Sequence, residues 1–257
     1  MTTTFQQRLK AIDSGATPMM CVATDYAADA RIEQHAHRKH QLVYAVRGVM
    51  VVQTPAGQWV VPPTRAIWMP AGTLHWIRCV GAVHMRSLFV KPGLAFSVPT
   101  ALQVVAISPL LRELIIAAAG IEHPYAASSR DARVMRLILD ELRTLPELPL
   151  HLPRPSDPRL RAICDRLDRE PDHDATLEYW ALKLEITAKT IQRLFARETG
   201  MTFGQWRQQI RLLRALERLA TGEKVLDVAI QLGYESPSAF ASMFKRQFGR
   251  TPSQFFE

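Results

Sequence analysis

The chain has 257 residues, of which 47% are hydrophobic and 22% charged, so it can form two domains with real cores and is not of the low-complexity class. Its net charge of +8 suggests a polyanionic partner. The sequence shows neither the apolar stretch of a signal peptide nor an apolar run long enough for a membrane span, which predicts a cytoplasmic protein. Three widely spaced cysteines, Cys21, Cys79 and Cys164, predict reduced thiols and neither a disulfide framework nor a zinc knuckle.

Residues 1–100 have the pattern of short β-strands. The segment "QLVYAVRGVMVVQTPAGQWVVPP" carries β-branched runs around a turn at 55–57, and "RAIWMPAGTLHWIRCV" and "AVHMRSLFVKP" continue the pattern. Short strands with turn residues at this spacing are typical of a small barrel or sandwich. We therefore expect an N-terminal barrel domain over 1–100.

The stretch "RIEQHAHRKHQ", residues 31–41, contains three histidines. His35 and His37 are two positions apart, so on a strand both side chains point to one face. Gln41 keeps the same parity. His40 has the opposite parity and is expected to point away.

This segment resembles the two cupin motifs. The first is His-x-His followed by a residue that is usually Glu and, later, by Gly48; the second is Pro-x-Gly-x-x-His, here "PAGTLH", which ends at His75. The resemblance implies an antiparallel β-barrel. It also implies that four side chains converge inside the barrel and can bind a metal ion: His35, His37, Gln41 and His75.

Three imidazoles suit a divalent ion such as Zn, Ni, Cu, Fe or Mn. Gln41 departs from the motif, because a neutral amide is a weaker ligand than Glu and leaves the site one negative charge short. The alternative is that these residues only form hydrogen bonds, in a barrel that binds an organic ligand or nothing. A second set of residues, all aromatic, is expected either to line a small-molecule pocket or to form the barrel core: Tyr44, Trp59, Trp68 and Trp76.

Helical patterns begin after about Thr100. Ser108 and Pro109 form a helix start, and the segment 128–145 has an apolar stripe that includes Val134, Leu137, Ile138 and Leu142. We assign 101–145 to a helical dimerisation segment. Residues 146–158 contain prolines at 146, 149, 153, 155 and 158, which exclude a continuous helix and predict a semi-extended linker.

The remainder, 159–257, contains a repeat of about 49 residues. The segments 177–203 and 226–252 match at Ala181 with Ala229, at Leu184 with Leu232 and, after one extra residue, at Phe195 with Phe244. Each copy predicts a short helix, a tight turn and a second helix, which is the arrangement of a helix-turn-helix unit. In the first unit, Thr187 is expected to cap a helix that buries Ile191, Leu194 and Phe195.

Residues 160–257 resemble the DNA-binding domain of AraC/XylS-type transcriptional regulators, and the segment "LDVAIQLGYESPSAFASMFKRQFGRTPSQFF" is close to the C-terminal signature of that family. The resemblance implies seven helices, with recognition helices at about 188–198 and 237–247. It also implies a homodimer through helices within 108–143. The histidine motifs resemble most closely a subgroup of short cupin-type members, some of which regulate a neighbouring transporter gene.

The side chains expected to contact double-stranded DNA lie on these two helices. Gln pairs with adenine, Arg with guanine, and both Lys and Arg bind phosphate. The set is Lys189, Thr190, Gln192, Arg193 and Arg197 on the first helix, and Ser238, Ser242, Lys245 and Arg246 on the second. The second helix has Ser242 where the family often has Arg, so we expect the first helix to give most of the base specificity.

The sequence leaves open the roles of two further features of the segment 159–257. Glu185 stands where the family usually has Gly, which strains the first turn if the residue needs a positive φ. An intervening helix carries an arginine stripe, and these side chains either contact phosphate or cover the core: Arg207, Arg211, Arg214 and Arg218.

The fold class expected from all these patterns is α+β with two domains, an antiparallel barrel followed by an all-α domain. The leading function is a sequence-specific DNA-binding transcription regulator, and not an enzyme, that responds to a small molecule or metal in the barrel. One alternative is a metal-dependent cupin enzyme fused to a DNA-binding module, supported by the three histidines. Another is an architectural DNA binder with an empty barrel, which would show sequence-independent binding with a steep salt dependence.

Overall fold

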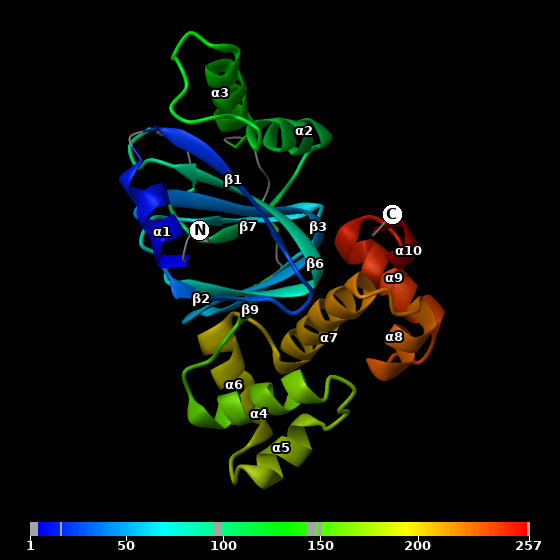
Figure 1. Ribbon diagram of the computed structural model, residues 1–257. Coiled ribbons are helices and arrows are strands. Elements are labelled where there is room, and N and C mark those ends of the chain that lie inside the picture. Colours follow the sequence, from blue (N-terminus) through cyan, green and yellow to red (C-terminus); the bar gives the residue numbers. More distant parts are fainter. Residues whose placement is uncertain (1–4, 16, 95–98, 143–146, 149–150, 256–257) are drawn as a thin grey trace. The chain divides into compact units, whose positions relative to one another are not determined.

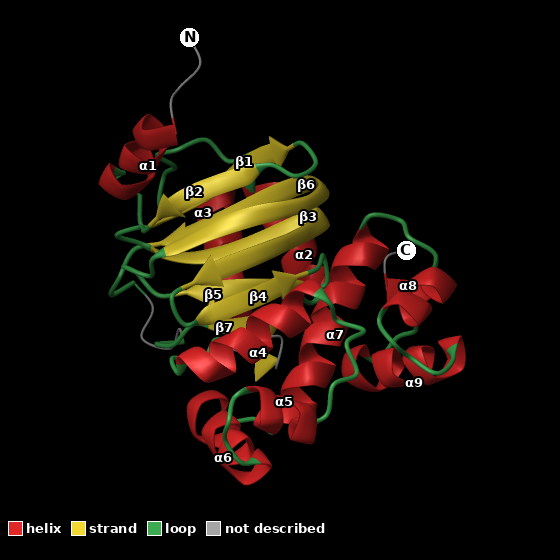
Figure 2. Cartoon of the chain, turned by 90° about the horizontal axis from the view of Figure 1, so that it is seen from below, coloured by secondary structure: helices red, strands yellow, loops and turns green. Residues whose placement is uncertain are grey.

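A computed structural model describes residues 5–15, 17–94, 99–142, 147–148 and 151–255 (Figure 1). The chain divides into two compact units. The first comprises residues 1–54 and 61–149, and the second comprises residues 55–60 and 150–257. Strands dominate the first unit and helices the second (Figure 2). The expected fold class, α+β with an antiparallel N-terminal domain and a helical C-terminal domain, is confirmed.

The first unit is built on an antiparallel sheet that follows a short helix, α1 (Phe5–Ser14). The strands are paired in the order β1-β6-β3-β5-β7-β8, and β2 pairs with β6. Their bounds are β1 Met19–Tyr26, β2 Arg31–His35, β3 His40–Thr54, β5 Arg65–Met69, β6 His75–Val90, β7 Gln103–Ala106 and β8 Glu147–Leu148.

Gly48 permits an irregularity in the longest strand pair. The register between β3 and β6 shifts between Ala45 and Val49, and Gly48 has φ +82° there. A Cβ at Gly48 would lie 2.3 Å from the carbonyl oxygen of Ala82, so only glycine fits. Steric exclusion of a side chain thus explains why the first cupin motif has glycine at this position.

Two helices complete the first unit, α2 (Pro109–Ala118) and α3 (Arg130–Leu142). Ser108 caps α2 as expected, because its hydroxyl accepts a hydrogen bond from the N–H of Leu111 at 3.0 Å. Ile138 and Leu142 are buried in one core with residues of β1, β3, β5 and β6. The prediction that this stripe forms a dimer face is therefore wrong at these two positions, because both side chains are buried in the core of their own chain.

Parts of the proline-rich segment 146–158 form short strands among the residues described. Residues Glu147–Leu148 form β8, which pairs with β7, and His151–Pro153 form β9, which pairs with β4 (Gly57–Val61). Pro158 is the first residue of the next helix. Pro146 and Pro149 lie outside the described residues. The prolines exclude a helix, as predicted, but they leave the extended conformation that strand pairing needs.

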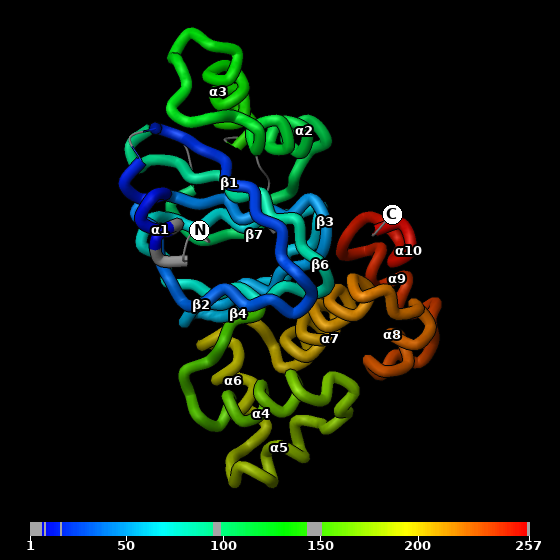
Figure 3. Tube along the Cα trace, viewed as in Figure 1, coloured from blue at the N-terminus to red at the C-terminus, as the bar shows by residue number. Residues whose placement is uncertain are grey.

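The second unit contains seven helices among the residues described. They are α4 Pro158–Arg169, α5 Leu177–Lys183, α6 Ala188–Thr199, α7 Phe203–Ala220, α8 Val225–Gln231, α9 Pro237–Phe248 and α10 Pro252–Phe255. Figure 3 shows them as the yellow-green to red part of the chain. None of the described helices is long and apolar enough to cross a membrane.

The tight turns that follow α5 and α8 have the same hydrogen bond in the two copies of the repeat. The N–H of Ile186 donates to the carbonyl of Ala181, and the N–H of Tyr234 donates to that of Ala229, both at 3.1 Å. Between these partners, Glu185 has φ +54° where the second copy has Gly233 at φ +71°. The turn thus needs a positive φ, and the first copy adopts it with a side chain, at a cost of roughly 1 kcal/mol.

Candidate metal centre and DNA-binding helices

Three histidines meet in the first unit. His35 is the last residue of β2, and it is paired in register with His75, the first residue of β6. His37 follows in the loop between β2 and β3. Their ring centroids lie 4.2 Å apart for His35 and His75, 5.0 Å for His35 and His37, and 5.9 Å for His37 and His75. One nitrogen of each ring lies within 4.8 Å of those of the other two.

Backbone carbonyls fix the orientation of two of these rings. Nδ1 of His35 donates to the carbonyl of Glu33 at 2.7 Å, and Nδ1 of His75 donates to that of Thr73 at 2.9 Å. A ring that donates from Nδ1 presents Nε2 as its metal ligand. Nε2 of His75 is buried and has no hydrogen-bond partner among the described residues. This pattern fits a metal ligand better than a hydrogen-bonded core histidine.

Burial sets the protonation of the cluster. It lowers the pKa of His37 and that of His75 to about 4, and it also lowers the pKa of His35. Near neutral pH the imidazoles are therefore neutral, which is the form that ligates a metal ion.

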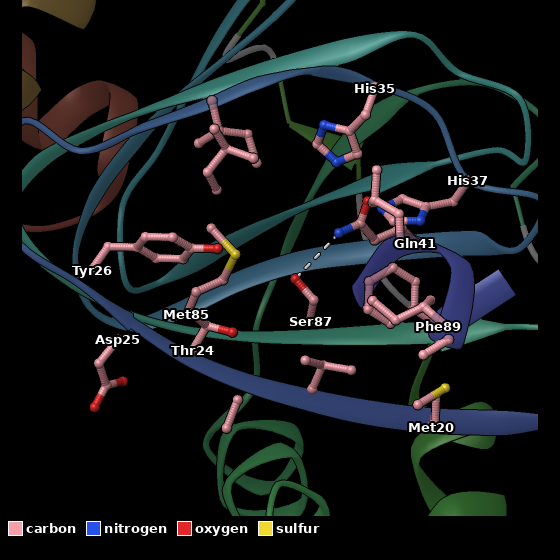
Figure 4. A pocket seen from close by; sticks show the side chains of 17 residues that line it. Met20, Thr24, Asp25, Tyr26, His35, His37, Gln41, Met85, Ser87 and Phe89 are labelled. Atoms are coloured by element: carbon pink, nitrogen blue, oxygen red, sulfur yellow. Dashed lines mark hydrogen bonds between the residues drawn. The ribbon is translucent and has the colours of Figure 1, made fainter. Parts of the chain in front are cut away.

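Gln41 lies beside the cluster on β3. Its Nε2 donates to the hydroxyl of Ser87 at 3.3 Å, which leaves the amide oxygen buried without a hydrogen-bond partner in the described part of the chain (Figure 4). An oxygen in this position can add a fourth, weak ligand. His40 lies outside the cluster, as expected: its Nδ1 accepts from the N–H of Ala71, and its ring stacks on Trp68.

The cluster opens onto a cavity of about 870 Å³. His35, His37 and Gln41 line one end, and the other lining residues are mostly apolar; they include Leu9, Ile12, Met20, Val22, Ile32, Met85 and Phe89. In Figure 4 the side chains of Tyr26, Thr24 and Met85 lie at the end away from the histidines. This size and lining are those of a site for a small, mostly apolar molecule.

Of the four aromatic residues expected either to line a pocket or to form the core, none is among those that line this cavity. Tyr44 and Trp68 belong to the core of the first unit. Trp59 stacks on His151 within the second unit, with ring centroids 4.3 Å apart, and the Trp76 indole donates to Gln53. The aromatic rings at the cavity are instead Tyr26 and Phe89.

The predicted recognition helices correspond to α6 and α9. On α6, the buried side chains are Ile191, Leu194 and Phe195, as expected, and Lys189, Arg193 and Arg197 are exposed, whereas Thr190 and Gln192 are half-buried. Thr187 caps α6 and Ser236 caps α9, each through its hydroxyl. On α9 the predicted DNA contacts are all exposed: Ser238, Ser242, Lys245 and Arg246.

The arginine stripe on α7 is engaged within the second unit. Arg211 donates to the carbonyl of Pro171 at 2.7 Å, and Arg214 forms ion pairs with Asp168 at 2.6 Å and with Glu217 at 2.8 Å. Arg207 lies over the ring of Phe203, and Arg218 pairs with Glu223. Of the two interpretations left open by the sequence, these contacts favour the structural one.

Glu198 of α6 is a positioning residue that the sequence patterns did not reveal. Its Oε2 accepts hydrogen bonds from the N–H of Ser156 at 2.8 Å, from the Ser156 hydroxyl at 2.9 Å and from the N–H of Asp157 at 3.0 Å. Asp157 is the N-cap of α4. Glu198 therefore ties α6 to the start of α4, and its partners lie too far away in the sequence for a local pattern to show them.

Replacing Glu198 with Gln is expected to lower the free energy of unfolding of the second unit by about 1 kcal/mol near pH 7, because neutral hydrogen bonds replace charge-assisted ones. The N–H of Asp157 and the hydroxyl of Ser156 lower the pKa of Glu198 to about 2. Its stabilisation is therefore complete above the unfolded-state pKa, about 4.5, and is lost as the pH falls toward about 2. Urea unfolding of both proteins across this range measures the difference, and a difference that is independent of pH contradicts the prediction.

Comparison with known proteins finds two domain families along the chain. Residues 17–182 match the AraC-like ligand binding domain, and residues 180–257 match a helix-turn-helix domain. The HTH-type transcriptional regulator NimR of Escherichia coli is 36% identical over 86% of this chain and 81% of its own length. The regulatory protein SoxS of Salmonella typhimurium is 33% identical over 37% of this chain and 91% of its own length.

Among solved structures, ToxT of Vibrio cholerae aligns over 93% of this chain and 98% of its own, with 10% identity and a TM-score of 0.39. The domain matches and the relative aligned over most of both chains agree with the histidine-bearing sheet and with the duplicated helix-turn-helix units described above. The chain belongs to the AraC family of transcriptional regulators, with an N-terminal ligand-binding domain and a C-terminal DNA-binding domain.

Proposed function

We propose that this regulator holds a divalent transition-metal ion at His35, His37 and His75, next to a cavity that takes a small, mostly apolar effector. The observation that carries the proposal is the orientation of the imidazoles. Two of them donate from Nδ1 to backbone carbonyls, and the nitrogens of all three rings converge within 4.8 Å. The Gln41 amide oxygen, buried without a hydrogen-bond partner among the described residues, would add a ligand. Zn, Ni, Cu, Fe and Mn all accept such a nitrogen-rich set.

The metal ion would cross-link the end of β2 to the start of β6, since His35 and His75 lie at these two ends. His35 and His37 also line the cavity, so an effector held there would lie next to the ion. The effector itself would be held by the apolar lining. Binding there would shift the population of the sensor domain between states that differ in their affinity for DNA.

For DNA binding, we propose that α6 reads bases and that α9 mainly contacts the backbone. Arg193 and Lys189 on α6 are exposed, whereas the exposed N-terminal side chains of α9 are short. We further propose a cytoplasmic homodimer on paired sites. The apolar side chains that α2 and α3 leave exposed are the candidates for the dimer contact: Leu110, Ile116 and Leu137. Sedimentation of the purified chain tests the dimer.

Footprinting on the DNA upstream of the protein's own gene, with and without a chelator, tests the proposed function. We expect a protected sequence whose protection changes when the chelator removes the metal. Metal content of the purified protein is measured in parallel. Absence of a protected sequence in every condition would overturn the DNA-binding proposal. Protection that is the same with and without the chelator would overturn only the proposed response to metal. Metal-dependent turnover of an aromatic compound would favour the enzyme alternative.

Arg193→Ala is expected to reduce operator selectivity by roughly 1–3 kcal/mol, the value of one good base contact. Ser238→Ala is expected to weaken binding to operator and to unrelated DNA by similar small factors, because a backbone contact carries no sequence information. Competition between operator and non-operator duplexes at fixed salt measures both variants. Equal losses of selectivity would show that the ranking of the two helices is wrong.

A further inference from the structure

Helix α1 brings a carboxylate to the histidine cluster. Asp13 is the penultimate residue of α1, and its Oδ1 lies 3.6 Å from Nδ1 of His37. The same oxygen accepts a hydrogen bond from the N–H of Arg38 at 3.0 Å, which holds the carboxylate against the loop that carries His37. Asp13 is not part of the group whose ligand atoms all lie within 4.8 Å of one another. It is therefore an outer partner of His37 and not a fourth member of that group.

With Asp13 included, the Nδ1 atom of each of the three rings faces an oxygen atom. Nδ1 of His35 faces the carbonyl of Glu33, Nδ1 of His75 faces that of Thr73, and Nδ1 of His37 faces the carboxylate of Asp13. Metal-ligating histidines usually donate their second N–H to a carbonyl or a carboxylate, which fixes the ring and makes it a better ligand. Nδ1 of His37 is buried and has no hydrogen-bond partner within 3.5 Å among the described residues.

The charge of the site is a second argument that Asp13 contributes to metal binding. Three neutral imidazoles and the amide of Gln41 leave a divalent ion without any anionic ligand. The Asp13 side chain is only 20% exposed, so its charge is less screened there than on an open surface. A carboxylate one imidazole ring away can offset part of the charge of the ion.

We propose that Asp13 is the positioning residue of the metal site: it accepts the Nδ1–H of His37 and supplies the negative charge that Gln41 does not. This inference rests on the proposed function. Its consequence is a link between the metal and α1, because the contact of 3.6 Å has to shorten to about 2.7–3.2 Å to become a hydrogen bond. Leu9 and Ile12 of the same helix line the cavity, so the metal would hold α1 against the effector site.

Titration of the full-length, metal-free chain with Co²⁺ tests this role. We expect Asp13→Asn to weaken Co²⁺ binding by about 10–100-fold, the usual cost of removing an outer partner. Asp25→Asn is the matched control, because it removes the same charge from a carboxylate that is 59% exposed, turned away from the histidines and paired with Arg86 at 2.8 Å (Figure 4). Asp25→Asn is expected to keep the wild-type affinity within about twofold. Thermal unfolding of each metal-free variant checks that it is folded.

Hydrogen exchange of α1 gives a readout that a merely structural role would not change. Co²⁺ should increase the protection of residues 5–14 in the wild type and in Asp25→Asn, but not in Asp13→Asn. Equal Co²⁺ affinity of Asp13→Asn and wild type, with equal protection of α1, would overturn the role of Asp13 while the metal site stands. A wild-type chain that binds no Co²⁺ would overturn the metal site itself and the role of Asp13 with it.

Discussion

Arg214→Ala is expected to lower the free energy of unfolding of the second unit by about 3 kcal/mol. The Arg214 guanidinium joins Asp168 of α4 to Glu217 of α7, at 2.6 and 2.8 Å. Glu217 is 7% exposed, so the variant removes the cation beside a buried carboxylate, which is far more costly than losing a surface pair. Urea unfolding, followed by hydrogen exchange in α4 and α7, measures the loss.

Arg218→Ala on the next turn of α7 is the matched control for Arg214→Ala. Arg218 pairs with Glu223 at 3.7 Å, and both side chains are about one-third exposed, so its removal should cost no more than about 1 kcal/mol. Equal destabilisation by the two variants would contradict the assignment of Arg214 as an anchor. A loss of DNA affinity in Arg214→Ala without a loss of stability would identify Arg214 as a phosphate contact instead.

The double variant His35→Ala/His75→Ala is expected to lower the affinity for a divalent metal ion by more than about 100-fold, because losing two direct ligands exceeds the 10–100-fold cost of losing one outer partner. Metal content after dialysis against a fixed free-metal concentration measures the effect. DNA protection by this variant should no longer change when a chelator is added.

His40→Ala provides the control for the histidine variants. His40 is close in sequence, but it lies outside the group of converging nitrogens and stacks on Trp68. We expect metal affinity close to that of the wild type, with a modest loss of stability from the missing stacking contact. If His40→Ala lost as much metal as the double variant, the assignment of the three-histidine site would be wrong.

Local patterns predicted the helical domain well because its signals are local. The predicted cap Thr187 of α6 bonds to the residue three positions later, as Ser108 of α2 does in the first unit, so a short sequence window contains the whole interaction. The repeat was also visible, because Ala181 and Ala229 serve the same tight turn in both copies. The resemblance, which has glycine where this chain has Glu185, raised the question of a positive φ, and the structure answers it with φ +54°.

The structure brings His35, His37 and His75 together, as the cupin resemblance implied, but strand parity does not account for it. Strand parity was used to put His35 and His37 on one face, yet β2 ends at His35 and His37 lies in the following loop. The register of β2 with β6, which brings His75 opposite His35, depends on the three-dimensional fold. Asp13 gave no signal at all, because a carboxylate on a helix 24 residues before His37 belongs to no motif.

An apolar stripe on a helix does not by itself distinguish a dimer interface from a buried core. Ile138 and Leu142 have the spacing of an interface, but the same spacing serves a core, and here the core contains them. The sequence likewise left open whether the aromatic residues line a pocket or form the core. Composition does not distinguish the partners of a buried ring: Trp59 lies against His151, and Trp68 lies against His40.

The short strand β4 affects how the DNA-binding half can be produced and studied. The second unit takes residues 55–60 from within the sensor sequence, and β4 pairs with β9 through Gly57 with Pro153 and Trp59 with His151. The other contacts of β9 include the Trp206 indole of α7, which donates to the carbonyl of Pro153. A fragment that starts at residue 150 would lack β4, so β9 would have an open edge and His151 would lose its stacking partner. The second unit, which comprises residues 55–60 and 150–257, is therefore intact only where both segments are present.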